Sequence, residues 1–156
     1  MKSIYLKFIN ILLAALLAGT SFGIWFGMNP MKYSASSYLD QQQNLVISLN
    51  TIMVTLVIAA TLVTGWSALQ YKQQKAYFAL LGIAALCFLS CLLISRFGNL
   101  PIQNEILSWS YDSMPENWTS LRDSWWNYHI LRTIAELIAL VLVVWVYLHM
   151  NTQNKN

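Results

Sequence analysis

The sequence predicts an all-α integral membrane protein built as a four-helix bundle. Hydrophobic residues make up 57% of its 156 residues and charged residues only 10%, whereas about a quarter of the residues of soluble proteins are charged. Four apolar runs are each long enough to cross a hydrocarbon core, which takes about 20 helical residues. Because unpaired backbone groups are costly in lipid, we interpret these runs as helices and not as strands.

The four runs define the predicted helices within a single transmembrane domain that spans residues 1–156. A polar stretch joins the first helix to the second, and a short turn joins the second to the third. A long segment, which we expect to be an ordered loop, separates the third helix from the fourth. The expected helices lie at about residues 8–28, 45–69, 76–96 and 117–150.

The first helix has two features besides its length. Its start resembles a signal peptide, but the apolar character continues through Ile24, Trp25 and Phe26, which favours an uncleaved helix. Small residues recur in it at four-residue spacing, at Gly19, Gly23 and Gly27. Such a stripe lets another helix approach closely, so it permits a homo-oligomer as readily as packing within the bundle.

The distribution of lysine and arginine predicts the orientation. Lys2, Lys7, Lys72, Lys75 and Lys155 fall on one side of the predicted spans, whereas Lys32, Arg96 and Arg122 fall on the other. Because cytoplasmic loops carry the excess of positive residues, both termini are expected in the cytoplasm. The loop before the fourth helix is then expected on the opposite side.

Several classes of site are not expected. The net charge of +3 comes from scattered residues, so a nucleic-acid partner is not predicted. Cys87 and Cys91 lie four residues apart in an apolar run, which favours packing over a disulfide or a metal site. His129 and His149 would lie about 30 Å apart along one helix, too far to hold one iron. We therefore predict no metal site.

Unusual residues follow one stripe of the predicted fourth helix, at three- and four-residue steps. Ionisable side chains inside a span are costly and usually face the bundle interior or a wet cavity. An imidazole exchanges protons near neutrality, and a neighbouring arginine can hold an oxyanion, so we expect His129 to be the functional centre. The stripe contains Arg122, Trp125, Trp126, His129, Arg132, Thr133 and Glu136.

Structural explanations compete with this functional one. Arg132 and Glu136 stand at i and i+4, where they can pair with each other. Tryptophan and tyrosine near helix ends commonly form an interfacial belt, which would account for Trp109, Trp118, Trp125, Trp126 and Tyr128. Polar residues within the spans, such as Asn10 and Asn50, are expected to hydrogen-bond from helix to helix, although they can also line a shared cavity.

The third loop and the fourth helix resemble the four-helix membrane family that groups bacterial proteins of unknown function with fungal anthrone oxygenases. The resemblance covers most of the chain and is specific in this region. One departure is Gln103, which stands where the family has asparagine directly after its Pro-Ile pair. The matching residues are Asn99, Pro101, Ile102, Trp109, Asn117, Trp118, Leu121, Arg122, Asp123, Trp125, Trp126, His129, Arg132 and Thr133.

The resemblance implies a bacterial inner-membrane protein and a cofactor-independent oxygenase that acts on an activated phenol. In this hypothesis a flat phenolic or quinol-type molecule stacks on tryptophans, His129 is the general base, and Arg122 or Arg132 stabilises the negative oxygen. Two alternatives remain open: a non-catalytic module that binds a lipid, a quinone or a partner protein, and a small transporter that uses Glu136. The expected ligand-binding residues are Trp118, Trp125, Trp126, Trp109, Asn99, Gln103 and Glu136.

Overall fold

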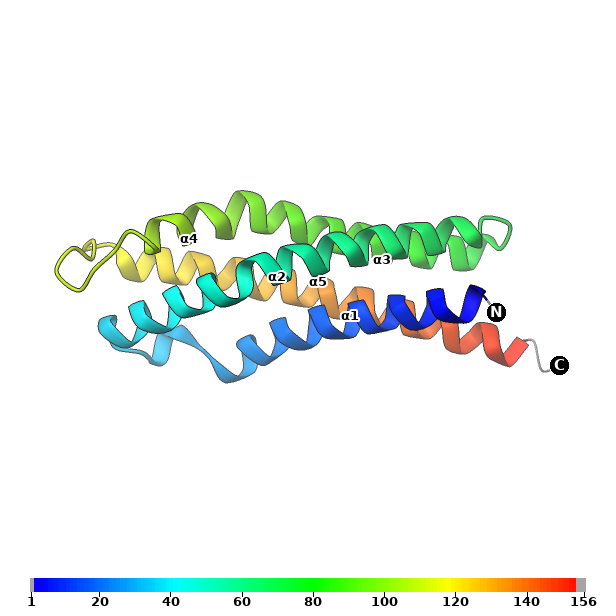
Figure 1. The fold of residues 1–156 in the computed structure, drawn as a ribbon, viewed down its shortest axis with the longest axis horizontal. Coiled ribbons are helices and arrows are strands. Elements are labelled where there is room, and N and C mark those ends of the chain that lie inside the picture. Colours follow the sequence, from blue (N-terminus) through cyan, green and yellow to red (C-terminus); the bar gives the residue numbers. More distant parts are fainter. Residues whose placement is uncertain (1, 154–156) are drawn as a thin grey trace.

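A computed structural model of the chain describes residues 2–153 and contains only helices and their connections in this range. Four long helices lie side by side in an elongated bundle (Figure 1). The predicted all-α fold with four membrane-spanning helices is therefore confirmed. The elements are α1 (Lys2–Gly27), η1 (Pro30–Lys32), α2 (Ala35–Gln70), α3 (Lys75–Ile94), η2 (Ser95–Asn99), α4 (Leu100–Ile106) and α5 (Trp118–Gln153).

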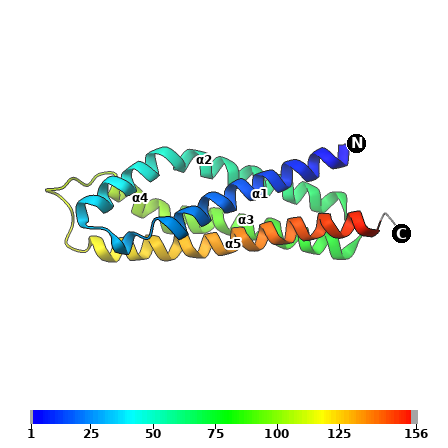
Figure 2. The ribbon, with the colours of Figure 1, turned by 90° about the horizontal axis from the view of Figure 1, so that it is seen from below.

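The helices form a closed ring of neighbours. α2 packs against α1 and α3, and α5 packs against the other sides of the same two helices. Both described ends of the chain lie at one end of the bundle, together with the turn between α2 and α3 (Figures 1 and 2). The loop between α4 and α5 lies at the opposite end (Figure 1). The two termini therefore lie on one side of the membrane, and their placement in the cytoplasm remains a prediction.

The described lysines near the termini are expected to lie at one boundary of the membrane. Lys7 and Lys75 line one recess with His149 and Met150 near the end of α5, and Lys72 lies in the turn between α2 and α3, while Lys155 lies outside the described residues. α2 has 36 residues, so it is about 54 Å long, whereas a hydrocarbon core is about 30 Å thick. Since the lysines hold the terminal end at the lipid boundary, the far end of the bundle extends beyond the core.

Three helix boundaries differ from the prediction by six residues or more, and the first is α1, which begins at Lys2 instead of at about residue 8. α2 begins at Ala35, ten residues before the predicted start, because Ser34 caps a polar first turn by accepting a hydrogen bond from the Ser37 amide at 3.3 Å. This turn lies outside the apolar run that defined the helix. The third span does not end at residue 96, because η2 and α4 continue it to Ile106. The non-helical loop before α5 is consequently limited to residues 107–117.

The π-helical turn η2 explains why the third span continues. Pro101 lies in the first turn of α4 and has no amide hydrogen to donate to the preceding turn. The chain widens just before it, and the Leu100 amide donates to the Ser95 carbonyl, five residues back. A Gly-Asn-Leu-Pro sequence that resembles a helix end is thereby kept within one continuous helix.

The loop between α4 and α5 is fastened to α2, as expected for an ordered loop. Gln43 donates hydrogen bonds to the carbonyls of Ile106 at 3.0 Å and Trp109 at 3.1 Å. The Tyr111 hydroxyl donates to Asp40 at 2.6 Å, and this hydrogen bond raises the pKa of Tyr111. The loop therefore has fixed contacts at both its start and its middle.

Polar side chains inside the bundle have two different roles. Asn10 of α1 donates to the Tyr147 hydroxyl at 2.8 Å and accepts from Thr64 at 2.7 Å, so it links three helices as expected. Asn50 instead lines a cavity near the opposite end. The glycine stripe of α1 is exposed, and a Cβ built at Gly19 would meet no atom within 4 Å. The stripe is therefore not used for packing within the described bundle.

Candidate functional site

A cavity of about 180 Å³ lies between α2, the α3–η2–α4 helix and α5, with one residue contributed by α1. Most of its wall is apolar, and the polar residues come from three different helices. Four predicted site residues are brought together here: Asn99, Gln103, Arg132 and Glu136. The other wall residues are Leu17, Asn50, Met53, Val54, Val57, Cys91, Leu92, Ser95, Arg96 and Leu100.

Arg132 is held from two sides by its terminal nitrogens. Its Nη1 donates to the Ser95 hydroxyl at 3.3 Å, and its Nη2 donates to Nδ1 of His129 at 3.2 Å. Its Nε is buried and has no hydrogen-bond partner among the described residues. Arg132 and Glu136 do not form the alternative i, i+4 ion pair, because the only salt bridge among the side chains that the structure describes, residues 4–150, joins Arg122 to Asp123. Arg132 and Glu136 thus both line the cavity without forming an ion pair with each other.

His129 is fully buried and uses both ring nitrogens in hydrogen bonds. A guanidinium only donates, so Nδ1 is an acceptor. Nε2 lies 3.2 Å from the Ser21 carbonyl, which only accepts, so Nε2 carries the proton. The imidazole is therefore neutral, in a single tautomer. His129 does not line the cavity, but it hydrogen-bonds to Arg132, which does.

Trp125 and Trp126 both contact the imidazole, and their own ring centroids lie 6.3 Å apart, so the three rings form one cluster. Their ring centroids lie 5.3 Å and 5.4 Å from that of His129, in stacked geometry. This stacking fixes the plane of the imidazole ring. The position of Nδ1, which accepts the hydrogen bond from Arg132, is fixed with it. Trp125 also lines a recess of about 30 Å³ that shares Arg132 with the main cavity. Two of the predicted ligand-binding tryptophans therefore support His129, and one of them also reaches the recess.

Two buried acceptors complete the polar wall. Glu136 is 1% exposed, and its Oε2 has no hydrogen-bond partner among the described residues. The side-chain amide nitrogen of Asn99 donates to the Trp125 carbonyl at 3.0 Å, which fixes the orientation of the amide. Asn99 Oδ1 then has no hydrogen-bond partner among residues 2–153. Because buried polar atoms are normally hydrogen-bonded, this arrangement is typical of a site that receives a polar ligand.

The π-helical turn positions one face of this wall. Ser95, Asn99 and Gln103 follow each other at four-residue spacing through η2 and α4, and all three line the cavity. Gly98 sits under the Tyr128 ring of α5, where a Cβ would lie 2.7 Å from the nearest ring carbon. The absence of a side chain at Gly98 therefore lets η2 approach α5 closely enough for Arg132 to reach Ser95.

We expect Gly98→Ala to destabilise the protein by about 1–3 kcal/mol, because the added methyl group overpacks this contact. Thermal unfolding in detergent measures the effect. Gly82→Ala is the matched control, since a Cβ there meets nothing within 4 Å. Adding Tyr128→Ala to Gly98→Ala should restore most of the loss. A single Gly98→Ala variant as stable as the control would show that the close contact carries no such constraint.

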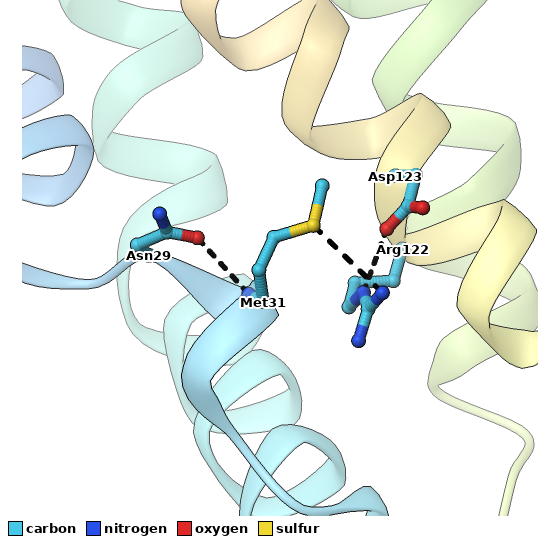
Figure 3. Close-up of polar contacts among 4 residues, drawn as sticks. All are labelled: Asn29, Met31, Arg122 and Asp123. Atoms are coloured by element: carbon cyan, nitrogen blue, oxygen red, sulfur yellow. Dashed lines mark hydrogen bonds and ion pairs between the residues drawn. The ribbon is translucent and has the colours of Figure 1, made fainter.

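The remaining predicted site residues lie away from the cavity, toward the far end of the bundle. Arg122 forms an ion pair with Asp123 at 2.8 Å and contacts the sulfur of Met31 at 3.8 Å (Figure 3). Its guanidinium also lies 5.1 Å from the centre of the Trp118 ring. Trp109 belongs to the buried aromatic cluster that contains Trp125 and Trp126. These residues cover the end of the bundle beyond the cavity.

Ser95 was missed by the sequence analysis, and the role of Asn50 was left open. Ser95 follows a long apolar run, and its place on the cavity depends on the π-helical turn. Asn50 belongs to α2, and nothing in its own surroundings in the sequence relates it to α5. A signal for Ser95 did exist, because Ser95, Asn99 and Gln103 share four-residue spacing. This spacing points to one helical face only if the third helix is continued past residue 96.

The fold and the cavity together define a multi-pass helical membrane protein with a small, partly polar chamber inside its bundle. Residues 43–142 match the anthrone oxygenase family. The chain belongs to this family. The match includes every residue of the cavity wall except Leu17. No curated protein and no solved structure matches the chain.

Proposed function

We propose that the protein oxidises a phenolic or quinol-type molecule with dioxygen in this cavity, without a cofactor. The observation that carries the proposal is the pair of buried groups, Arg132 and Glu136, which line one mostly apolar chamber without pairing to each other. Burying a cation and a carboxylate is costly unless partners compensate. A ligand that exchanges a proton with Glu136 and places a negative oxygen against Arg132 supplies this compensation. The family name supports the same chemistry.

The proposed reaction begins with removal of a proton. The Glu136 carboxylate takes it from the phenol or from an activated carbon of its keto form, and the resulting anion places its oxygen against the Arg132 Nε–H. This electron-rich anion reduces dioxygen directly. For a methylene carbon, the peroxide formed at carbon breaks its O–O bond: one oxygen remains as a carbonyl, and the other leaves as water with the two hydrogens of the methylene. One dioxygen is consumed for each carbonyl formed at a methylene carbon. A quinol instead transfers two electrons and two protons to one dioxygen, which gives the quinone and hydrogen peroxide and places no oxygen atom in the product.

The geometry favours Glu136 over His129 as the proton acceptor. Nδ1 of His129 already accepts from Arg132, and Nε2 already carries a proton that it shares with a carbonyl. His129 also lies outside the cavity wall. We therefore propose His129 as a positioning residue that holds the guanidinium in place. Arg122 has no place in this chemistry, because it is engaged with Asp123 and Trp118 at the end of the bundle.

The test measures dioxygen consumption by purified protein under ¹⁸O₂ with a panel of phenols and quinols, each compared with its rate of spontaneous oxidation. We expect a protein-dependent rate and, for substrates that gain a carbonyl, one ¹⁸O atom in the product by mass spectrometry. Arg122→Gln protein should behave like the wild type. Binding of a panel member without protein-dependent dioxygen uptake would instead support the alternative, a non-catalytic binding module.

A further inference from the structure

We propose that the cavity takes a single-ring phenol or quinol that carries an apolar tail and arrives from the bilayer. We propose further that it binds the hydroxyl form of this ligand in preference to the carbonyl form. The proposal rests on the proposed function for the location of the site. It adds the size of the ligand, its route into the site and the oxidation state that is recognised.

The volume of the cavity sets the size of the ring system. An engineered cavity of about 150 Å³ in another protein binds benzene. At about 180 Å³, the chamber described here holds one substituted ring. Three fused rings need considerably more room. The adjoining recess of about 30 Å³ adds space for one small molecule and not for a second ring.

The position of the mouth indicates the route from the bilayer. Val54 of α2 is 38% exposed and Arg96 of η2 is exposed, and both line the cavity. The chamber therefore opens between α2 and η2, on the outer surface of the bundle. Val54 lies 16 residues before Gln70, the end of α2 near the lysines, which is about 24 Å along the helix. This level is still within a hydrocarbon core about 30 Å thick.

The polar wall of the cavity lies slightly further from the lysine end of the bundle than the mouth does. Asn50 is 20 residues before Gln70, or about 30 Å, which is the level at which the hydrocarbon core ends. A ligand with its ring against this wall would extend its remaining length back through the mouth into lipid. This division between a polar head and an apolar remainder predicts an amphiphile, such as a phenol or quinol with an alkyl or isoprenoid tail.

The unpartnered atoms specify which ring substituent fits. Asn99 Oδ1 is an acceptor, Glu136 Oε2 is an acceptor in the carboxylate form that the proposed reaction requires, and Arg132 Nε is a donor. A hydroxyl group both donates and accepts, so it can satisfy acceptors and donor together. A quinone carbonyl or a methyl ether only accepts, and it leaves both acceptors unpaired. A buried acceptor left unpaired weakens binding by about ten- to hundredfold.

The experiment measures dissociation constants under argon in lipid nanodiscs, so that turnover cannot alter the ligand. The probes are 2-decyl-1,4-hydroquinone, the corresponding quinone and the corresponding dimethyl ether. We expect the hydroquinone to bind at least tenfold more tightly than the other two. Glu136→Gln should reduce the ratio of the dissociation constant of the quinone to that of the hydroquinone, because the glutamine amide can donate to a quinone carbonyl. Glu105→Gln, at an exposed position outside the cavity wall, should leave the ratio unchanged.

A second pair of variants tests the route. Val54→Trp should weaken binding of decylhydroquinone at least tenfold by filling the mouth. Leu62→Trp, on an exposed part of α2 outside the cavity wall, should not weaken it. Equal effects of the two variants would overturn the lateral route. Equal affinities for the three probes, or tighter binding of decylbenzene than of decylhydroquinone, would overturn hydroxyl recognition and indicate a groove for alkyl chains.

These outcomes are separate from failure of the proposed function. Preferential binding of the hydroquinone under argon stands even if the protein never consumes dioxygen. Conversely, a protein that oxidises a tricyclic phenol rapidly but binds the three decyl probes equally would keep its proposed oxygenase activity. That result would overturn the inference made here about ligand size and recognition.

Discussion

Glu136→Gln protein is expected to lose about 10²–10⁴-fold in turnover number at saturating phenol, the usual contribution of a positioned general base. Glutamine has nearly the same shape but cannot take the proton, and it remains able to hydrogen-bond in the cavity. Glu136 is 1% exposed and lines the chamber, so this carboxylate is in reach of a ligand there. Initial rates of dioxygen uptake, with thermal unfolding to confirm the fold, measure the effect.

The control for this prediction is Glu105→Gln, which alters an exposed carboxylate and should leave turnover unchanged. His129→Asn separates the two candidate bases. Asparagine offers an oxygen near the position of Nδ1, so it can still accept from Arg132, but it cannot exchange a proton. If His129 only positions Arg132, this variant keeps most of its activity. If His129→Asn loses as much as Glu136→Gln while staying folded, the sequence-based assignment of His129 as the base is restored.

Arg132→Lys is expected to lower the turnover number about 10²–10³-fold, because it removes a preorganised donor to a developing oxyanion. The guanidinium hydrogen-bonds to Ser95 and to His129 in different directions and still keeps Nε for a ligand. A lysine ammonium keeps the charge but is a single point on a flexible stem, so it cannot hold this fork geometry. Retention of the charge also limits destabilisation of the buried site.

Arg122→Lys is the matched control, because it makes the same change outside the cavity. We expect it to alter turnover by less than about twofold, since the ion pair that it perturbs lies outside the cavity wall. Dissociation constants measured under argon distinguish lost binding from lost chemistry. Equal turnover in Arg132→Lys and Arg122→Lys proteins, with ligand bound in both, would remove Arg132 from the mechanism.

Much of this architecture could be predicted from the sequence because lipid restricts the choices. Four apolar runs can only be helices, and ionisable residues within them must find an interior environment. The residue type and spacing of Arg132 and Glu136 were therefore sufficient to place them inside. The family resemblance added Asn99 and Gln103, which lie on the opposite wall of the same cavity.

The shape of the third helix could not be predicted by the same reasoning. Gly98 and Pro101 both favour the end of a helix when a regular α-helix is assumed. A π-helical turn removes the conflict at Pro101, and the neighbouring helix α5 supports it through the Gly98–Tyr128 contact. This support is tertiary, so it has no local signal. The sequence-based prediction consequently placed the residues after 96, which form part of the cavity wall in η2 and α4, in a loop.

The stripe on the fourth helix also proved to be less uniform than its periodicity indicated. Arg122 contacts η1, His129 reaches the Ser21 carbonyl of α1, and Arg132 reaches Ser95 of η2. These residues share one face of α5, but that face borders different neighbours along the length of the helix. Periodicity identifies the face, whereas only the arrangement of the other helices determines which partner each residue meets.

The mouth of the cavity opens to lipid, while an aromatic cluster that contains Trp109, Trp125 and Trp126 closes the end of the bundle toward water. Dioxygen and a tailed phenol both partition into hydrocarbon. The membrane is therefore the solvent for both reactants, and aqueous concentration is the wrong variable for describing saturation. Below saturation, the reaction rate should rise with the mole fraction of substrate in the bilayer, so diluting the membrane with inert lipid would slow the reaction at constant total substrate.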